Sequence, residues 1–191
     1  MALGSLVSIA ASTFNRVMVV ELSLLQIIPG LLLALHYFIQ ISRPNWGFLS
    51  DKGGNRTFWI IIGVIILCLG SILACIGILL IPENYLFGLT ISIFAYTLIG
   101  IGVGASGTSL LAFLATRTDN SKKAAAATIT WIMMIFGAAF TAIFVGKIID
   151  PYSIEKLLKI VTIISLFWII TSFITFHLKV YRTERSIFVD Q

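Results

Sequence analysis

Long apolar runs alternate with short polar connections along almost the whole chain. Several of these runs reach or approach the roughly 20 residues that cross a hydrocarbon core about 30 Å thick. Backbone amides in lipid must be hydrogen-bonded within their own segment, so each run is expected to be a helix. The expected spans are Met1–Val20, Gln26–Ile41, Phe58–Ile81, a run within Leu86–Ala115, Ala124–Val145 and Ile160–Phe176.

The pattern therefore predicts an all-α membrane protein with six transmembrane helices in residues 1–178. Residues 179–191 are expected to form a cytoplasmic tail. The first run is short, because Asn15 and Arg16 follow only fourteen uncharged residues. This helix is either tilted and partly covered by its neighbours, or it begins upstream of Met1.

Composition supports lipid as the main surrounding of the chain. Of its 191 residues, 59% are hydrophobic and 11% charged, with a mean hydropathy of +1.05. A soluble domain is about one quarter charged. The net charge of +5 is therefore attributed to the connections between helices, and nucleic acid is not expected as a partner.

The basic residues predict the orientation of the helices. With both termini on the cytoplasmic side, the outer connections hold only Lys147, Lys156 and Lys159. The inner connections hold nine basic residues: Arg43, Lys52, Arg56, Arg117, Lys122, Lys123, Lys179, Arg182 and Arg185. An excess of lysine and arginine marks cytoplasmic connections, so both termini are predicted to be cytoplasmic.

A glycine-rich charged segment joins the second and third runs and reads Gly47-Phe-Leu-Ser-Asp51-Lys-Gly-Gly54-Asn-Arg56. Its glycines are expected to let the backbone turn at once. Asp51 offers an anion to an arginine or to a helix N-terminus. The alternative interpretation is a polar loop with no role beyond joining two helices.

This segment resembles the loop between helices two and three of the major facilitator superfamily, written G-x-L-A/S-D-R/K-x-G-R/K-R/K. Only Asn55 departs from the pattern. The resemblance implies that six helices form half of a twelve-helix bundle. It also implies an ion pair between Asp51 and Arg117.

Two sets of polar residues lie within the expected spans, where ionisable groups usually mark function. His36, Gln40 and Arg43 share one helical face at spacings of four and three. Asn15, Arg16 and Glu21 form the second set. Arg16 and Glu21 are five residues apart, which is poor for a pair within one helix, so partners on other helices are expected.

These polar residues allow two interpretations. They could hydrogen-bond between helices and fix the bundle. Alternatively, a neutral His36 could be an axial ligand for a magnesium tetrapyrrole, or a proton-relay group.

Small residues predict where helices pack closely. Gly100, Gly104 and Thr108 form a stripe in the fourth run, and Gly137 offers a similar position in the fifth. The letters from Gly102 to Gly107 also match a dinucleotide fingerprint, but no strand–turn–helix context surrounds them. No catalytic set, metal-ligand spacing or phosphate loop is evident, so neither an enzyme nor a metal protein is expected.

Several segments resemble one branch of the superfamily, the PucC/LhaA group, also called the bacteriochlorophyll delivery family. They match its amino-terminal half in order. The segments are Asn15–Leu22, Ala34–Tyr37, Arg43-Pro44 leading into Ser50-Asp51, Trp131–Gly137, and Gly146 with Asp150–Ser153.

This resemblance implies a role in assembling light-harvesting complexes in the inner or photosynthetic membrane of a bacterium. Handling of chlorophyll or bacteriochlorophyll is the implied mechanism, with antenna polypeptides or pigment-synthesis proteins as partners. A six-helix chain would pair with a second six-helix half or with its own copy. The alternatives are half of a secondary transporter for a small solute, with His36, Gln40, Arg16 and Glu21 along its path, and a truncated inactive copy.

Overall fold

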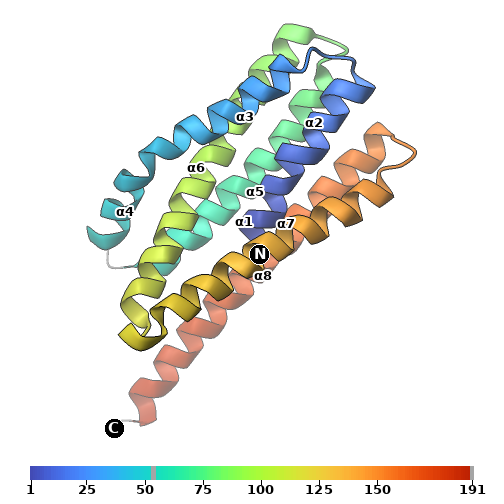
Figure 1. Cartoon of the computed structure of the whole chain (residues 1–191). Helices are drawn as coiled ribbons and strands as arrows, with labels where there is room; N and C mark the ends of the chain where they lie inside the picture. The colour runs from blue at the N-terminus through green and yellow to red at the C-terminus, as the bar shows by residue number, and fades with distance from the viewer. Residues whose placement is uncertain (53–54, 190–191) are drawn as a thin grey trace.

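The computed structural model describes residues 1–52 and 55–189, and these residues form helices and turns without a strand. Successive helical segments run alternately up and down and form an elongated bundle (Figure 1). The first helix is continuous from Ala2 to Glu21. The helices after it are α3 (Ile27–Ile39), α4 (Arg43–Lys52), α5 (Arg56–Leu80), α6 (Tyr85–Arg117), α7 (Lys123–Ile148) and α8 (Ile154–Val189).

Five of the described helices are long and apolar enough to cross a membrane, which confirms the prediction of an all-α, multi-pass membrane protein. They are Ala2–Glu21, Arg56–Leu80, Tyr85–Arg117, Asn120–Ile148 and Ile154–Thr175.

The second expected span is interrupted. α3 ends at Ile39, a 3-10 turn covers Gln40–Ser42, and α4 then continues to Lys52. Pro44 accounts for the break, because it has no amide hydrogen to donate to the Gln40 carbonyl four residues earlier and its ring crowds that carbonyl, whereas the first turn of a new helix tolerates it.

α5 and α6 form the most extensive contact between described helices, and small residues make their close packing possible. A Cβ atom on Gly102 would lie 2.6 Å from the backbone nitrogen of Leu67, and one on Gly63 would lie 2.5 Å from that of Ser106. Lipid tails are as apolar as the helices, so association in a membrane depends on such close packing.

The first helix contains two π-helical segments, Ile9–Thr13 and Val17–Glu21, on either side of the short α2 (Phe14–Arg16). A π-helical turn shifts the backbone hydrogen bonds by one residue. The Ala10 carbonyl in the first of these segments accepts a hydrogen bond of 3.0 Å from the buried Tyr96 hydroxyl of α6. The phenol and the carbonyl therefore satisfy each other inside the bundle.

α7 and α8 lie at the outside of the bundle. α7 packs on the first helix, where Ser5 Oγ and Thr141 Oγ1 are 2.6 Å apart. Half of the most apolar stretch of α5 is buried, but only 17% of the corresponding stretches of α7 and α8. Phe136, Phe140 and Phe144 consequently form an exposed ladder of stacked rings along α7.

We expect Gly102→Ala to lower the free energy of unfolding by about 1–3 kcal/mol, because the added methyl group would overpack the α5–α6 seam. Thermal unfolding in detergent measures this change. Gly146→Ala on α7 is the matched control, since nothing lies within 4 Å of its added Cβ atom. Equal melting temperatures for the two variants would contradict the close seam.

Candidate functional site: an apolar cavity with one polar edge

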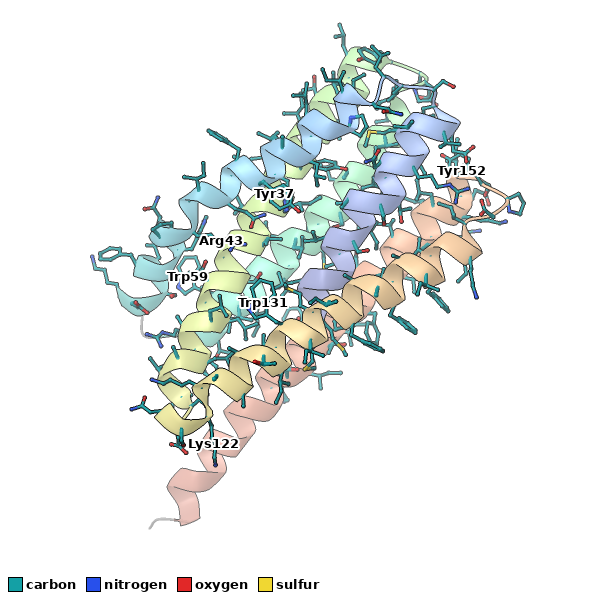
Figure 2. All side chains as sticks on the ribbon, in the orientation of Figure 1. Tyr37, Arg43, Trp59, Lys122, Trp131 and Tyr152 are labelled. Atoms are coloured by element: carbon teal, nitrogen blue, oxygen red, sulfur yellow. The ribbon has the colours of Figure 1, made fainter. Side chains whose placement is uncertain are left out.

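A cavity of about 450 Å³ opens between the first helix, α3 with α4, α6 and α7. Most of its wall is apolar, and the polar side chains gather near the α3–α4 junction. Figure 2 labels three of the lining residues, Tyr37, Arg43 and Trp131. The other apolar lining residues are Leu3, Val7, Ala11, Val103, Leu110, Leu111, Met134, Ile135 and Ala138.

His36, Gln40 and Arg43 form a hydrogen-bonded chain at the polar edge of this cavity. Arg43 Nη2 donates to Gln40 Oε1, and Gln40 Nε2 lies 2.9 Å from His36 Nε2. The chain runs from the exposed Arg43 to the His36 ring, which is 1% exposed. His36 Nδ1 is buried and has no hydrogen-bond partner in the described structure.

α3 and α4 pack closely against α6, because the residues on the side of α6 that faces them are small. A Cβ atom on Gly100 would lie 2.8 Å from the His36 carbonyl oxygen, and one on Gly104 would lie 3.3 Å from Trp46 Cδ1. A Cβ atom on Gly47 of α4 would lie 3.4 Å from the methyl carbon of Thr108. The small-residue stripe thus faces the helix that carries the His36 chain.

Gly137 lies elsewhere, where α7 meets the start of the chain. A Cβ atom there would lie 2.8 Å from the carbonyl oxygen of Met1. Ser8 Oγ donates to the carbonyl oxygen of Ala138 at 3.0 Å, so small and hydroxyl-bearing residues share this contact.

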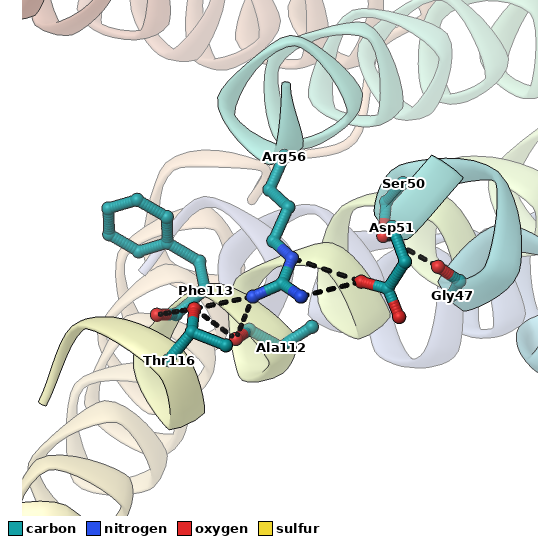
Figure 3. A network of polar contacts seen from close by, with 7 residues as sticks. All are labelled: Gly47, Ser50, Asp51, Arg56, Ala112, Phe113 and Thr116. Atoms are coloured by element: carbon teal, nitrogen blue, oxygen red, sulfur yellow. Dashed lines mark hydrogen bonds and ion pairs between the residues drawn. The ribbon is translucent and has the colours of Figure 1, made fainter. Parts of the chain in front are cut away.

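Arg56 is the centre of the network at the α4–α5 turn (Figure 3). Its Nη2 lies 2.7 Å from Asp51 Oδ1, and its Nη1 donates to the Ala112 carbonyl oxygen at 2.8 Å and to Thr116 Oγ1. The expected Asp51–Arg117 ion pair is not among those of the described residues. Arg56 takes its place because it begins α5 directly beside Asp51 and the end of α6, whereas Arg117 is exposed and lines the same small cavity.

One glycine of this segment also differs from expectation. Gly47 was expected to turn the backbone, but it lies within α4 and allows close approach to Thr108 of α6. Gly54, like Gly53, lies outside the described residues. Asn55, the one departure from the superfamily pattern, caps α5 by accepting a hydrogen bond from the Phe58 amide at 3.4 Å. Asparagine is among the preferred residues at this position.

Arg16 finds its partner at the opposite end of the bundle, in the connection between α7 and α8. Its Nη2 lies 2.6 Å from Asp150 Oδ1, and its Nη1 donates to Asp150 Oδ2 at 3.4 Å. The hydrogen bond and positive charge of Arg16 lower the pKa of Asp150 below its ordinary value. A partner outside the first helix is the expectation for Arg16, but helical spacing gives no indication that this partner is Asp150.

Asn15 and Glu21, the other two residues of the second polar set, are not at the centre of any network described above. Asn15 is half-buried beside Arg16, and Glu21 is exposed at the end of the first helix, outside the ion pairs of the described residues. Tyr96 was missed altogether, because an isolated tyrosine in an apolar run gives no signal of its distant carbonyl partner. The described part of the chain holds no cluster of three or more His, Cys, Asp or Glu side chains suited to a metal ion.

Comparison with known proteins gives consistent matches over nearly the whole chain. A family model described as "PUCC protein" matches residues 13–187. The "Bacteriochlorophyll synthase 44.5 kDa chain" of Rhodobacter capsulatus is 55% identical over 166 residues, which are 87% of this chain and 39% of that protein. No solved structure matches the chain significantly.

Two further relatives are more distant. "Protein PucC" of Cereibacter sphaeroides is 25% identical over 84% of this chain and 38% of its own length. "Protein PucC" of Rhodobacter capsulatus is 24% identical over 83% of this chain and 37% of its own length. The chain thus spans about two fifths of the length of these relatives.

Arg56→Gln is expected to destabilise the protein by about 1–2 kcal/mol, because the Ala112 carbonyl and Asp51 lose their charged donor. Arg117→Gln is the matched control and should change stability by about 0.5 kcal/mol or less. Chemical unfolding in detergent, followed by tryptophan fluorescence, measures both. A larger effect of the Arg117 variant would indicate that Asp51 pairs with Arg117 instead.

The Arg16–Asp150 pair predicts a pH dependence with a definite sign. The depressed pKa means that the pair stabilises the fold above the unfolded-state pKa, and that this stabilisation is lost as pH falls through the folded-state pKa. Arg16→Gln should therefore raise the pKa of Asp150. Titration of 13C-carboxyl-labelled aspartate, assigned with Asp150→Asn, measures this shift, and an unchanged pKa would contradict the pairing.

Proposed function

The chain belongs to the PUCC protein family, and from this premise we propose that it binds a bacteriochlorophyll-type pigment in the cavity and assists assembly of light-harvesting complexes. The cavity with its single polar edge is the observation that carries the proposal. The relative named for bacteriochlorophyll supports the pigment class. The pigment supplies the light-absorbing macrocycle that an antenna complex needs.

The cavity suits a flat apolar molecule with polar substituents on one side. Its volume lies within the range of about 300–1,000 Å³ typical of small-molecule sites, where apolar walls carry a few placed polar groups. Trp131 and Met134 of α7 line one wall, and Val103 and Leu110 of α6 line another. An aromatic ring and a thioether pack well against the face of a macrocycle.

The polar edge suits the carbonyl substituents of such a pigment. Arg43 carries more hydrogen-bond donors than Gln40 uses, and the guanidinium is exposed. Among the described side chains, His36 Nδ1 is the only buried nitrogen without a hydrogen-bond partner. We therefore assign pigment orientation to this edge and pigment burial to the apolar walls.

Handling of a pigment, not its synthesis, is the role we propose, although one relative carries the word synthase in its name. The cavity wall is mainly apolar, and the hydroxyls of its Ser8 and Thr130 are bonded to backbone carbonyls of α7, an arrangement suited to holding a ligand in place. The whole length of the relatives is about two and a half times the matched segment, so a second helical half or another copy would complete the assembly. Antenna polypeptides and pigment-synthesis proteins are the partners proposed for that assembly.

We place the chain in the inner or photosynthetic membrane of a bacterium, with both termini cytoplasmic. The turns at the α4–α5 and α6–α7 ends carry Lys52, Arg56, Arg117, Lys122 and Lys123. The opposite end has fewer basic residues, which supports this orientation.

We expect bacteriochlorophyll to co-purify with the chain from a pigment-making host, and Gly107→Leu to reduce the pigment per protein roughly tenfold, or about 1.4 kcal/mol. Gly107 lines the cavity, and the atom nearest to an added Cβ would be 4.0 Å away, so the substitution begins without a clash and adds bulk at the cavity wall. Absorption spectroscopy of the purified protein measures the ratio.

Gly146→Leu is the matched control, because it makes the same change at an uncrowded position away from the cavity. It should retain the pigment of the unchanged chain. Absence of pigment from the unchanged chain, or equal loss in both variants, would overturn the proposal.

A further inference from the structure

The direction of the hydrogen bonds in the Arg43–Gln40–His36 chain follows from chemistry alone. An arginine guanidinium has only donors, so the amide atom of Gln40 facing Arg43 must be its carbonyl oxygen. The –NH₂ group of Gln40 then faces His36 Nε2 at 2.9 Å. Arginine thereby fixes which side of the amide the histidine meets.

The amide in turn fixes the proton on His36. A carboxamide nitrogen can only donate, so His36 Nε2 must accept with its lone pair. The imidazole is then neutral and carries its proton on Nδ1. Which ring nitrogen is protonated is set by the bond that the other nitrogen makes, and here Arg43 sets it through Gln40.

We propose that Arg43 and Gln40 lock His36 as the Nδ1–H tautomer, so that His36 is a hydrogen-bond donor and not an axial ligand for a pigment's metal. The lone pair of Nε2 is occupied by Gln40, and Nδ1 offers a proton instead of a lone pair. His36 lines the cavity but is only 1% exposed, so little of its side chain is open to a ligand in this arrangement. Magnesium ligation through Nε2 would require the Gln40–His36 bond to break. Ligation through Nδ1 would leave the proton on Nε2, so the Gln40 amide would have to turn its oxygen toward His36 and lose its bond to Arg43.

The way the cavity recognises a pigment changes accordingly, and this part of the inference rests on the proposed function. Tetrapyrrole recognition there depends on the apolar walls and on Arg43 as a donor to an oxygen substituent, independently of the central metal. His36 is then a positioning residue that holds Gln40, and through it Arg43, at the edge of the cavity.

The tautomer can be measured in the pigment-free protein. The sequence contains two histidines, so 15N-histidine labelling gives two sets of ring signals, and His177→Gln assigns those of His36. We expect a bare Nε2 and a protonated Nδ1, distinguished by their couplings to the ring carbon-bound protons. A protonated Nε2 in the unchanged chain would overturn the proposal.

Gln40→Glu provides a sharper test with nearly the same shape. A carboxylate beside Nε2 can only accept, so we expect Nε2 to gain a proton while the Arg43 contact persists. Gln26→Glu, in the connection before α3, is the matched control and should leave the His36 signals unchanged. A bare Nε2 in Gln40→Glu would contradict the lock, and the measurement on the unchanged chain decides the matter if this variant does not fold.

Binding of two probes separates this inference from the proposed function. Bacteriochlorophyll and its metal-free counterpart, bacteriopheophytin, should bind with the same Kd, and Arg43→Leu should weaken both equally. Metal-free pigment binding about tenfold or more weakly, with the difference abolished in His36→Leu, would indicate axial ligation. If neither probe binds, the proposed function fails. The 15N measurement on the pigment-free protein still tests the His36 tautomer independently.

Discussion

Close approach of α5 and α6 is the constraint on which the rest of the bundle depends. Helices surrounded by lipid gain little from burying apolar surface against each other, so they associate where backbones can pack tightly. Gly63 and Gly102 provide this at the centre of the seam. With α6 fixed in this way, Gly100 and Gly104 on another of its faces receive the α3–α4 segment, and the cavity lies beside that contact.

The polar groups of the bundle follow a second constraint, because an unpaired polar group is costly in an apolar setting. Tyr96 satisfies a carbonyl at the π-helical part of the first helix, and Arg16 is held by Asp150. Arg43, Gln40 and His36 satisfy each other in one direction only, from donor to acceptor. Exceptions among the described side chains are the buried hydroxyls of Ser109, Tyr152 and Ser165 and the Nδ1 atom of His36. Of these residues, His36 lines the cavity that we propose for the pigment.

The outer helices have large apolar surfaces that the rest of the described chain does not cover. α7 and α8 leave most of their apolar surface uncovered, including the ladder of Phe136, Phe140 and Phe144. The chain also spans only about two fifths of the length of its relatives. One wall of the cavity belongs to α7, so a molecule that packed on α7 would also affect the proposed pigment site.

The sequence by itself determined the helical class and the approximate limits of the helices, because crossing a lipid core demands long apolar runs whose backbone is internally bonded. It also placed His36, Gln40 and Arg43 on one face, since their spacing is a local property of a helix. Only the tertiary structure paired Asp51 with Arg56, Arg16 with Asp150 and Tyr96 with Ala10. These pairings depend on which helices are neighbours and on their relative positions along the bundle axis. Residue spacing within one helix gives no information about either.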